Sequence, residues 1–189
     1  AAIDCTGHGI PGAFMSLLNM GFLSEAIKEK NIVKPNEVFD YVRARLISSI
    51  GNDGQKDGMD GVLLCYDKAN ARLEYAAANN APVMVFNDEL RELNKDRTPV
   101  GQGEQNKPFQ LQTIALEPGS ALYVYTDGYA DQFGGPKGKK FKYRSLNNLL
   151  LANYNLPVND QLNILETELD NWKGELEQVD DVCVIGLKF

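Results

Sequence analysis

Apolar residues recur at helical spacing in four stretches of the chain. The first stretch covers residues 10–30 and the second begins at about Pro35. Two more lie toward the C-terminal end, at about residues 143–152 and 159–173. Apolar side chains three or four positions apart share one face of a helix, so each stretch is predicted to form a helix with a buried face. The expected buried positions are Phe14, Leu17, Leu18, Phe22, Leu23 and Ile27, then Val38, Phe39, Val42, Leu46 and Ile47, and finally Leu162, Leu165, Leu169 and Trp172.

Short β-rich runs separated by turn residues occupy the middle of the chain. Such runs in close succession predict an antiparallel meander. A short apolar run at residues 1–3 and another at residues 182–189 add a strand at each end. Helices on both sides of an antiparallel β middle predict a layered α+β fold. The predicted middle strands are Val62–Tyr66, Arg72–Ala76, Pro82–Phe86, Glu89–Leu93, Phe109–Ala115 and Ala121–Tyr125.

Aspartates stand where three of the predicted strands end or begin. Asp4 follows the first apolar run, Asp127 follows the run ALYVYT, and Asp180 and Asp181 precede the last run. If the first two strands lie antiparallel to the last, these carboxylates meet at one edge of a sheet. Clustered carboxylates repel one another, and a divalent cation that prefers oxygen ligands removes that cost. The pattern therefore predicts a metal site at one edge of an antiparallel sheet.

Composition and charge narrow the class of protein. A chain of 189 residues suits one domain, and a net charge of −7 argues against nucleic-acid binding. No apolar run approaches the roughly 20 residues needed to span a bilayer, so we expect a cytoplasmic domain without membrane contact. Cys5, Cys65 and Cys183 are far apart in apolar or strand-like contexts, as expected of free thiols in a reducing compartment. Because His8 is the only histidine and no CxxC pair occurs, a zinc site is not expected.

Two loops are rich in charge and glycine. Residues 51–61, GNDGQKDGMDG, lack the ligand spacing of an EF-hand, so a calcium-binding module there is the weakest of the functional alternatives. Residues 132–142 hold four lysines in an otherwise acidic chain. This second loop is either a solvated loop or a flap that meets an anionic substrate.

Three ordered motifs resemble a known family. DCTGHGIPGAFMS, YTDGYAD and VDDVCVIGLKF, at these distances, resemble the SpoIIE-type branch of the PPM (PP2C-like) metal-dependent serine/threonine phosphatases over essentially the whole chain. The resemblance implies one domain over residues 1–189. It implies an α/β/β/α sandwich, in which two antiparallel sheets carry helices on both outer faces. It also implies two Mn²⁺ or Mg²⁺ ions at one end of the sheets.

The resemblance also assigns roles to individual residues. Asp4 matches the acid that bridges both metals, and Cys5 matches the neighbour that offers its main-chain carbonyl. Asp127 and Asp180 match further metal ligands, and Asp131 matches an acid associated with a weaker, additional metal. Asp4, Asp127 and Asp180 are thus the expected catalytic set. Two cations activate a shared water for in-line attack on phosphorus, so no nucleophilic side chain is required.

Other polar residues near these motifs keep two interpretations each. His8 is either a general acid for the leaving group or, as we favour, a structural residue that hydrogen-bonds in its turn or supports the metal shell. Asp57 and Asp60 either orient metal-bound water or stabilise their loop. Asn79 and Asn80 lie where many relatives have Gly-His, a departure expected to alter the edge of the site. Asp181 is either a partner of the metal ligands or a cap at the start of the last strand.

One feature of the family is missing from the sequence. Relatives carry an acidic metal ligand on a strand upstream of the Asp4 segment. We therefore expect this chain to be a C-terminal fragment of a longer signalling protein, with N-terminal strands missing and a metal site that is only partly built.

The predicted function is metal-dependent hydrolysis of phosphoserine or phosphothreonine on a regulatory protein, such as an anti-sigma-factor antagonist. The domain would be the output module of a bacterial signalling protein with an upstream sensor, and homodimerisation through the helix layer is compatible with that role. The alternative is a catalytically impaired domain of the same fold that binds a partner. The retained Asp4, Asp127 and Asp180 argue against this alternative, and the missing upstream acid argues for it.

Overall fold

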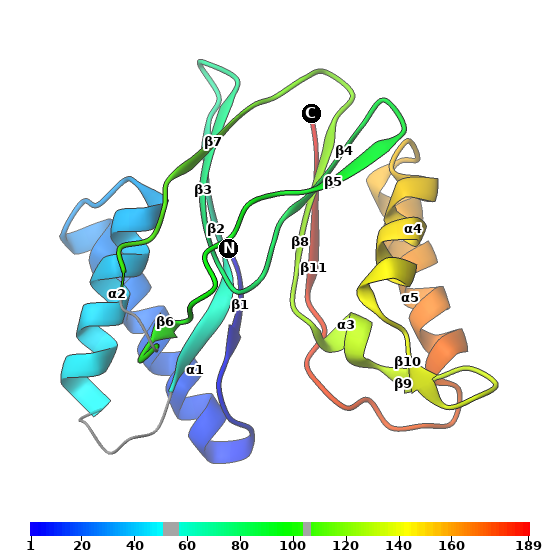
Figure 1. The fold of residues 1–189 in the computed structure, drawn as a ribbon, viewed down its shortest axis with the longest axis horizontal. Helices are drawn as coiled ribbons and strands as arrows, with labels where there is room; N and C mark the ends of the chain where they lie inside the picture. The colour runs from blue at the N-terminus through cyan, green and yellow to red at the C-terminus, as the bar shows by residue number, and fades with distance from the viewer. Residues whose placement is uncertain (51–56, 104–106) are drawn as a thin grey trace. The chain divides into compact units, whose positions relative to one another are not determined.

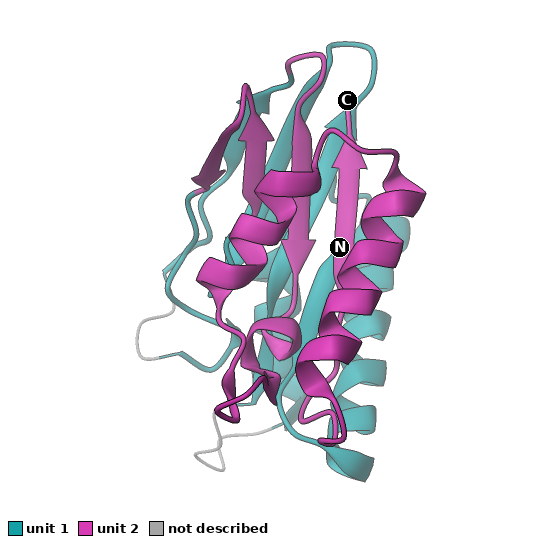
Figure 2. Ribbon diagram, turned by 90° about the vertical axis from the view of Figure 1, so that its right-hand side faces the viewer, with its two compact units in different colours: residues 1–81, 94–116 teal, residues 82–93, 117–189 magenta. Residues whose placement is uncertain are grey.

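Two compact units make up the protein. The computed structural model describes residues 1–50, 57–103 and 107–189. One unit consists of residues 1–81 and 94–116, and the other of residues 82–93 and 117–189 (Figure 2). Each unit has an antiparallel sheet with helices packed against it, so the described residues form the two antiparallel sheets of the predicted α+β class. The single domain over residues 1–189 stays a prediction.

The first unit contains a five-stranded antiparallel sheet. The strand order is β1-β2-β3-β7, and β6 also pairs with β2 (Figure 1). Asp4 lies opposite Asp60 where β1 pairs with β2. A tight turn joins β2 to β3, because Asp67 Oδ1 accepts hydrogen bonds from the backbone N–H groups of Ala69 and Asn70. The strands are β1 Ala2–Cys5, β2 Gly58–Asp67, β3 Arg72–Ala78, β6 Val100–Gly101 and β7 Gln112–Ala115.

Two helical segments cover this sheet. Helix α1, Gly9–Ser24, continues as a π-helical turn, η1, Glu25–Glu29, and helix α2 spans Pro35–Ile50. As predicted, α2 buries Val38, Phe39, Val42 and Leu46. The core also includes Phe109, whose ring stacks edge-on against Phe39. Arg43 is buried beside it, and its two terminal guanidinium nitrogens donate to the carbonyls of Lys107 and Pro99, which offsets part of the cost of burying this cation.

The buried face of α1 differs from the prediction. Met15, Asn19, Phe22 and Ala26 of α1 and η1 are buried. By contrast, Phe14 and Leu17, expected in the core, are 63% and 68% exposed, and Ile27 is exposed as well. The pattern misled because α1 is apolar on nearly all sides, so helical spacing alone does not select one face. Ile10 and Met20 extend the exposed apolar side of α1.

Helix α1 and η1 together form a longer apolar segment than the sequence analysis expected. The continuous helical segment Gly9–Glu29 has 21 residues and a mean hydropathy of 1.2, which meets the length and composition criteria for a membrane span. The core helix of a soluble protein meets the same criteria, and one face of this segment packs into the core of the first unit.

The second unit contains a four-stranded antiparallel sheet in the order β11-β8-β4-β5. β8 and β11 are antiparallel, as the sequence predicted, with Tyr125 opposite Val184. A small hairpin of β9 and β10 follows the short helix α3. The strands are β4 Val83–Phe86, β5 Glu89–Glu92, β8 Ala121–Tyr125, β9 Phe133–Gly134, β10 Lys139–Lys140 and β11 Val184–Lys188, and the helices are α3 Gly128–Asp131, α4 Tyr143–Asn153 and α5 Val158–Lys173.

Tyrosine hydroxyls tie this sheet to its helices. Tyr123 donates to Gln161 Oε1 over 2.6 Å, and Tyr129 donates to the Leu165 carbonyl over 2.8 Å. Burial raises the pKa of Tyr123 to about 12, so its phenol stays neutral and able to donate. Gln161, which accepts the Tyr123 hydrogen bond, is the buried residue in the first turns of α5. Leu162, expected in the core, is exposed.

Two further expectations change with the structure. Asp4 belongs to the sheet of the first unit, and Asp127 and Asp180 flank strands of the second sheet, so the idea of one common sheet edge was wrong. The loop expected at residues 51–61 ends earlier, because β2 already begins at Gly58. The calcium-binding alternative rests mostly on residues 51–56, which lie outside the described residues.

Candidate metal centre

Asp127 and Asp180 are brought together by the pairing of β8 with β11. Beyond the last paired residues, Thr126 N–H donates to the Cys183 carbonyl over 3.0 Å, and Thr126 Oγ1 accepts from Cys183 N–H over 3.0 Å. The same hydroxyl donates to the Asp181 carbonyl over 3.1 Å. The threonine side chain therefore extends the pairing of β8 with β11 by one residue. This extension places its neighbour Asp127 beside the segment that contains Asp180.

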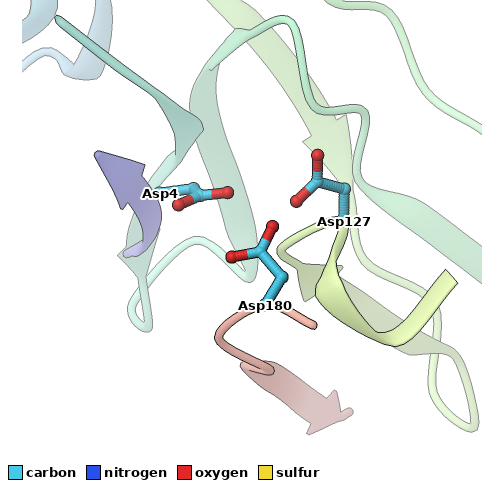
Figure 3. A group of neighbouring side chains, drawn as sticks. All are labelled: Asp4, Asp127 and Asp180. Carbon is cyan, nitrogen blue, oxygen red and sulfur yellow. The ribbon is translucent and has the colours of Figure 1, made fainter. Parts of the chain in front are cut away.

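Gly128 allows the two segments to approach closely. A Cβ at Gly128 would overlap the backbone carbonyl oxygen of Asp181. Ligand oxygens of Asp127 and Asp180 lie within 4.8 Å of each other. Figure 3 shows the two carboxylates at the end of β8 and in the segment before β11. The Thr-Asp-Gly motif and the Asp-Asp pair thus have a joint structural purpose, which is to hold two carboxylates at one end of the second sheet.

The Asp127 carboxylate has an oxygen without a partner. Asp127 Oδ1 is buried, and no group among the described residues hydrogen-bonds to it. Asp180 Oδ1 accepts a hydrogen bond from the N–H of its neighbour Asp181, over 2.8 Å, and the Asp180 side chain is exposed. A buried, unsatisfied carboxylate oxygen beside a second carboxylate is costly unless a cation binds there. Both groups are hard oxygen donors, so the pair fits Mg²⁺ or Mn²⁺.

Asp4 lies in β1 of the first unit, one residue before the strand ends, and is half-buried. Figure 3 shows its side chain. Its cross-strand neighbour Asp60 accepts a hydrogen bond from Asn79 Nδ2 over 2.9 Å. Asn79 adopts a left-handed backbone conformation with φ of 56°, which asparagine tolerates better than most residues. The hydrogen bond from Asn79 holds the Asp60 side chain in place, as the interpretation of Asp60 as a stabilising residue requires.

Cys5 and His8 flank the turn that follows Asp4. Cys5 Sγ accepts a hydrogen bond from Asn19 Nδ2 over 3.4 Å, and burial raises the pKa of the Cys5 thiol. The thiol is therefore a packing group, and only the main-chain carbonyl of Cys5 stays a predicted metal ligand. His8 is exposed at the N-cap position of α1, and its side chain makes no capping hydrogen bond to the helix. Its structural role in the turn or beside the metal shell stays a prediction.

Asp131 lies one helical turn beyond Asp127 and has a cationic partner. Its N–H donates to the Asp127 carbonyl over 2.9 Å, and its Oδ2 accepts from Lys140 Nζ over 2.7 Å. This ion pair connects Asp131 to the β9–β10 hairpin. The role of Asp131 as a ligand of a weaker metal stays a prediction.

Gln132 is a site residue that the sequence did not reveal. Its side chain is fully buried, Nε2 donates to the Glu177 carbonyl over 3.0 Å, and Oε1 accepts from Val179 N–H over 3.3 Å. Gln132 thereby joins the end of α3 to the segment that leads into Asp180. An amide between an acidic motif and a glycine-rich loop has no periodic or motif signal, so only the folded chain identifies it.

Substituting Gly128 by alanine should separate the two carboxylates. The added Cβ collides with backbone, which cannot rotate away as a side chain does. We expect Gly128→Ala to weaken Mn²⁺ binding by about tenfold or more in calorimetry, since misplacing metal-site geometry costs 10- to 100-fold. Gly21→Ala is the matched control, because a Cβ at Gly21 meets no atom within 4 Å. Unchanged Mn²⁺ affinity in Gly128→Ala would show that the close approach of Gly128 to Asp181 does not determine the geometry of the metal site.

Comparisons with known proteins place this geometry in a family. The family model of Stage II sporulation protein E (SpoIIE) matches residues 1–189. The SiaA-PP2C domain of Pseudomonas aeruginosa superimposes with a TM-score of 0.87 at 26% identity, over 99% of this chain and 73% of that one. The PP2C phosphatase domain of SpoIIE from Bacillus subtilis, solved with a fragment of its regulatory domain, gives 0.75 at 14% identity, over 99% of this chain and 53% of that one. Protein IcfG of Synechocystis is 29% identical over 122 residues, which are 64% of this chain and 19% of IcfG.

The fold is that of PP2C-type domains, which confirms the predicted fold class and the predicted PP2C-type enzyme class. The chain belongs to the SpoIIE family, because the family model matches it from end to end. It spans less than a fifth of IcfG and about half of the solved SpoIIE chain. Membership confirms the predicted family, and the PP2C-type homologues support a phosphatase function in signalling.

Proposed function

We propose that this chain hydrolyses phosphoserine or phosphothreonine on a regulatory protein, using a water molecule activated by two Mn²⁺ or Mg²⁺ ions. The observation that best supports this proposal is the buried, unsatisfied Asp127 Oδ1 beside the Asp180 carboxylate. When bound, the cations would lower the pKa of the attacking water and offset charge on the phosphoryl oxygens. Attack forms a new P–O bond as the bond to the serine oxygen breaks, and that oxygen takes up a proton.

The protein's own residues have distinct tasks in this proposal. Asp4 would bridge the two cations, with the Cys5 carbonyl beside it, and Asp127 and Asp180 would complete the ligand set. Asp131 would hold a weaker, additional cation. Thr126 and Gly128 hold the Asp127 carboxylate near Asp180 before any cation arrives. A site that is assembled in advance loses less conformational freedom on binding, which favours affinity.

The setting of the reaction is proposed by family analogy. The domain would act in the cytoplasm as the output module of a longer signalling protein. Its substrate would be a phosphorylated regulator of the anti-sigma-factor antagonist type. A homodimer through the helix layer stays a prediction, and the exposed apolar side of α1 is a surface that such an interface would use.

Phosphate release tests the proposal directly. With millimolar Mn²⁺ we expect release of phosphate from phosphoserine and phosphothreonine peptides, loss of release on adding EDTA, and recovery on adding excess Mn²⁺. Calorimetry in the same buffer separates the alternatives. Mn²⁺ binding without turnover of any phosphopeptide would favour the catalytically impaired, partner-binding domain. Phosphate release that persists in EDTA would contradict a metal-activated water.

A further inference from the structure

We propose that the β9–β10 hairpin, residues 133–142, docks an acidic segment of the phosphoprotein substrate beside the catalytic acids. This inference rests on the proposed function and names the chemistry of its substrate. The hairpin holds Lys137, Lys139, Lys140 and Lys142, and Arg144 follows it. No acidic residue occurs between positions 132 and 144, although the whole chain has a net charge of −7.

Most of these cations have no partner within the described part of the chain. Lys140 pairs with Asp131 over 2.7 Å. Lys137, Lys139 and Lys142 are exposed, and none of the ion pairs between described residues includes them. Like charges gathered on one small hairpin repel one another. An anionic partner would remove that repulsion, so the patch fits an acidic ligand better than a neutral one.

The hairpin is held firmly at its base. Phe141 N–H donates to the Gln132 carbonyl over 3.0 Å, and Gly135 N–H donates to the Trp172 carbonyl over 2.8 Å. Trp172 Nε1 also donates to the Gln132 carbonyl, and the Trp172 ring packs edge-on against Phe141. A Cβ at Gly134 would overlap the Trp172 carbonyl, so the hairpin lies directly against α5. A surface that is already ordered loses little conformational entropy when it binds.

The location of the hairpin links it to the reaction. α3 is a single turn, Gly128–Asp131, with Asp127 at its N-cap position, and the hairpin begins two residues after Asp131. The ion pair of Lys140 with Asp131 joins the hairpin to that turn. An acidic segment bound by Lys137 and Lys139 would therefore lie close to the Asp127–Asp180 end of the second unit. Exposed Phe133 adds an apolar contact on the same hairpin.

The proposed partner of the hairpin is the acidic sequence that flanks the phosphorylated residue of the substrate protein. The probes are a phosphoserine peptide flanked by aspartate and glutamate, the same peptide with these acids replaced by serine, and p-nitrophenyl phosphate. The variant is Lys137→Glu with Lys139→Glu, which leaves Lys140 and its Asp131 partner intact. The control is Lys68→Glu with Lys95→Glu, two exposed lysines of the first unit whose reversal changes the net charge equally.

The hairpin variant should raise KM for the acidic peptide by about tenfold at low ionic strength with kcat unchanged, since exposed charge pairs contribute up to about 1 kcal/mol each. KM for the serine-substituted peptide and kcat/KM for p-nitrophenyl phosphate should stay the same. Added salt should reduce the difference. An unchanged KM for the acidic peptide, or an equal rise in the control variant, would overturn the proposal.

Failure of the proposed function has a different signature. If the unaltered protein hydrolyses none of the three probes in Mn²⁺, the phosphatase proposal fails and the docking proposal is tested by binding alone. Fluorescence anisotropy of the labelled acidic phosphopeptide then reports the affinity. Tenfold weaker binding by the hairpin variant would support the docking surface, and equal binding by both variants would refute it.

Discussion

Replacing Asp127 by asparagine should abolish phosphatase activity and leave the fold intact or slightly more stable. The amide has the same shape and lacks the charge that a cation needs. We expect kcat/KM to fall by more than about 100-fold, because changes at residues outside the ligand set already cost 10- to 100-fold. The metal-free protein should not lose stability, since Asp127 Oδ1 is buried without a hydrogen bond and removing its charge relieves a desolvation cost. Mn²⁺ calorimetry, phosphate release and urea unfolding measure these three effects.

Asp181→Asn is the matched control for this prediction. Asp181 is exposed, and its main-chain carbonyl accepts a hydrogen bond from Thr126 Oγ1, which asparagine preserves. We expect its activity to stay within about twofold of the unaltered protein. Equal losses of activity in Asp127→Asn and Asp181→Asn would mean that activity depends on the total negative charge of this region and not on Asp127 in particular. Loss of stability in Asp127→Asn would mean that Asp127 is a structural residue.

Replacing Gln132 by leucine should lower both stability and metal affinity. The substitution leaves the Glu177 carbonyl and the Val179 N–H without their partner in the partly buried contact that they make with the buried Gln132 side chain. Each unsatisfied buried group costs about 1–3 kcal/mol, so we expect the free energy of unfolding to drop by about 2–4 kcal/mol. Because these bonds fix the segment that leads into Asp180, Mn²⁺ affinity at 25 °C should fall by about tenfold. Urea unfolding and calorimetry on the folded variant check the two effects separately.

Gln178→Leu provides the comparison for Gln132→Leu. Gln178 lies in the same segment and donates to the Asp180 carbonyl over 2.8 Å, but its side chain is exposed. Water replaces such a bond at little cost, so we expect a change in unfolding free energy within about 0.5 kcal/mol. If Gln132→Leu lowers stability and leaves Mn²⁺ affinity unchanged, Gln132 supports the fold without positioning Asp180.

The secondary structure was largely predictable because its signals are local. The predicted strand at residues 121–125 and the predicted helix starting at Pro35 match β8 and α2. The short elements were missed, among them α3, β6 and the β9–β10 hairpin. Segments of two to four residues contain too few positions for a period to show, and backbone hydrogen bonds from distant residues define them.

Burial on the helices was predictable only where the two faces differ in polarity. In α2, polar residues fill the outer side, so Val38, Phe39 and Val42 were assigned correctly to the core. In α1 almost every position is apolar, and Phe14 and Leu17 were assigned to the wrong side. The side that is buried follows from where α2 and the sheet lie, which is information from distant parts of the chain.

The sequence by itself determined which acids lie at or near the ends of strands, because a carboxylate next to a β run is a local pattern that Asp4, Asp127 and Asp180 all share. It also determined the family through three ordered motifs, which the family model confirms. Only the tertiary structure decided that Asp127 and Asp180 meet through Thr126 and Gly128, that Asp127 Oδ1 is left unsatisfied, and that Gln132 and the lysine hairpin belong to the same end of the second unit. Hydrogen bonds and backbone approaches between residues some 50 positions apart have no local sequence signal, and they set the geometry on which a metal site depends.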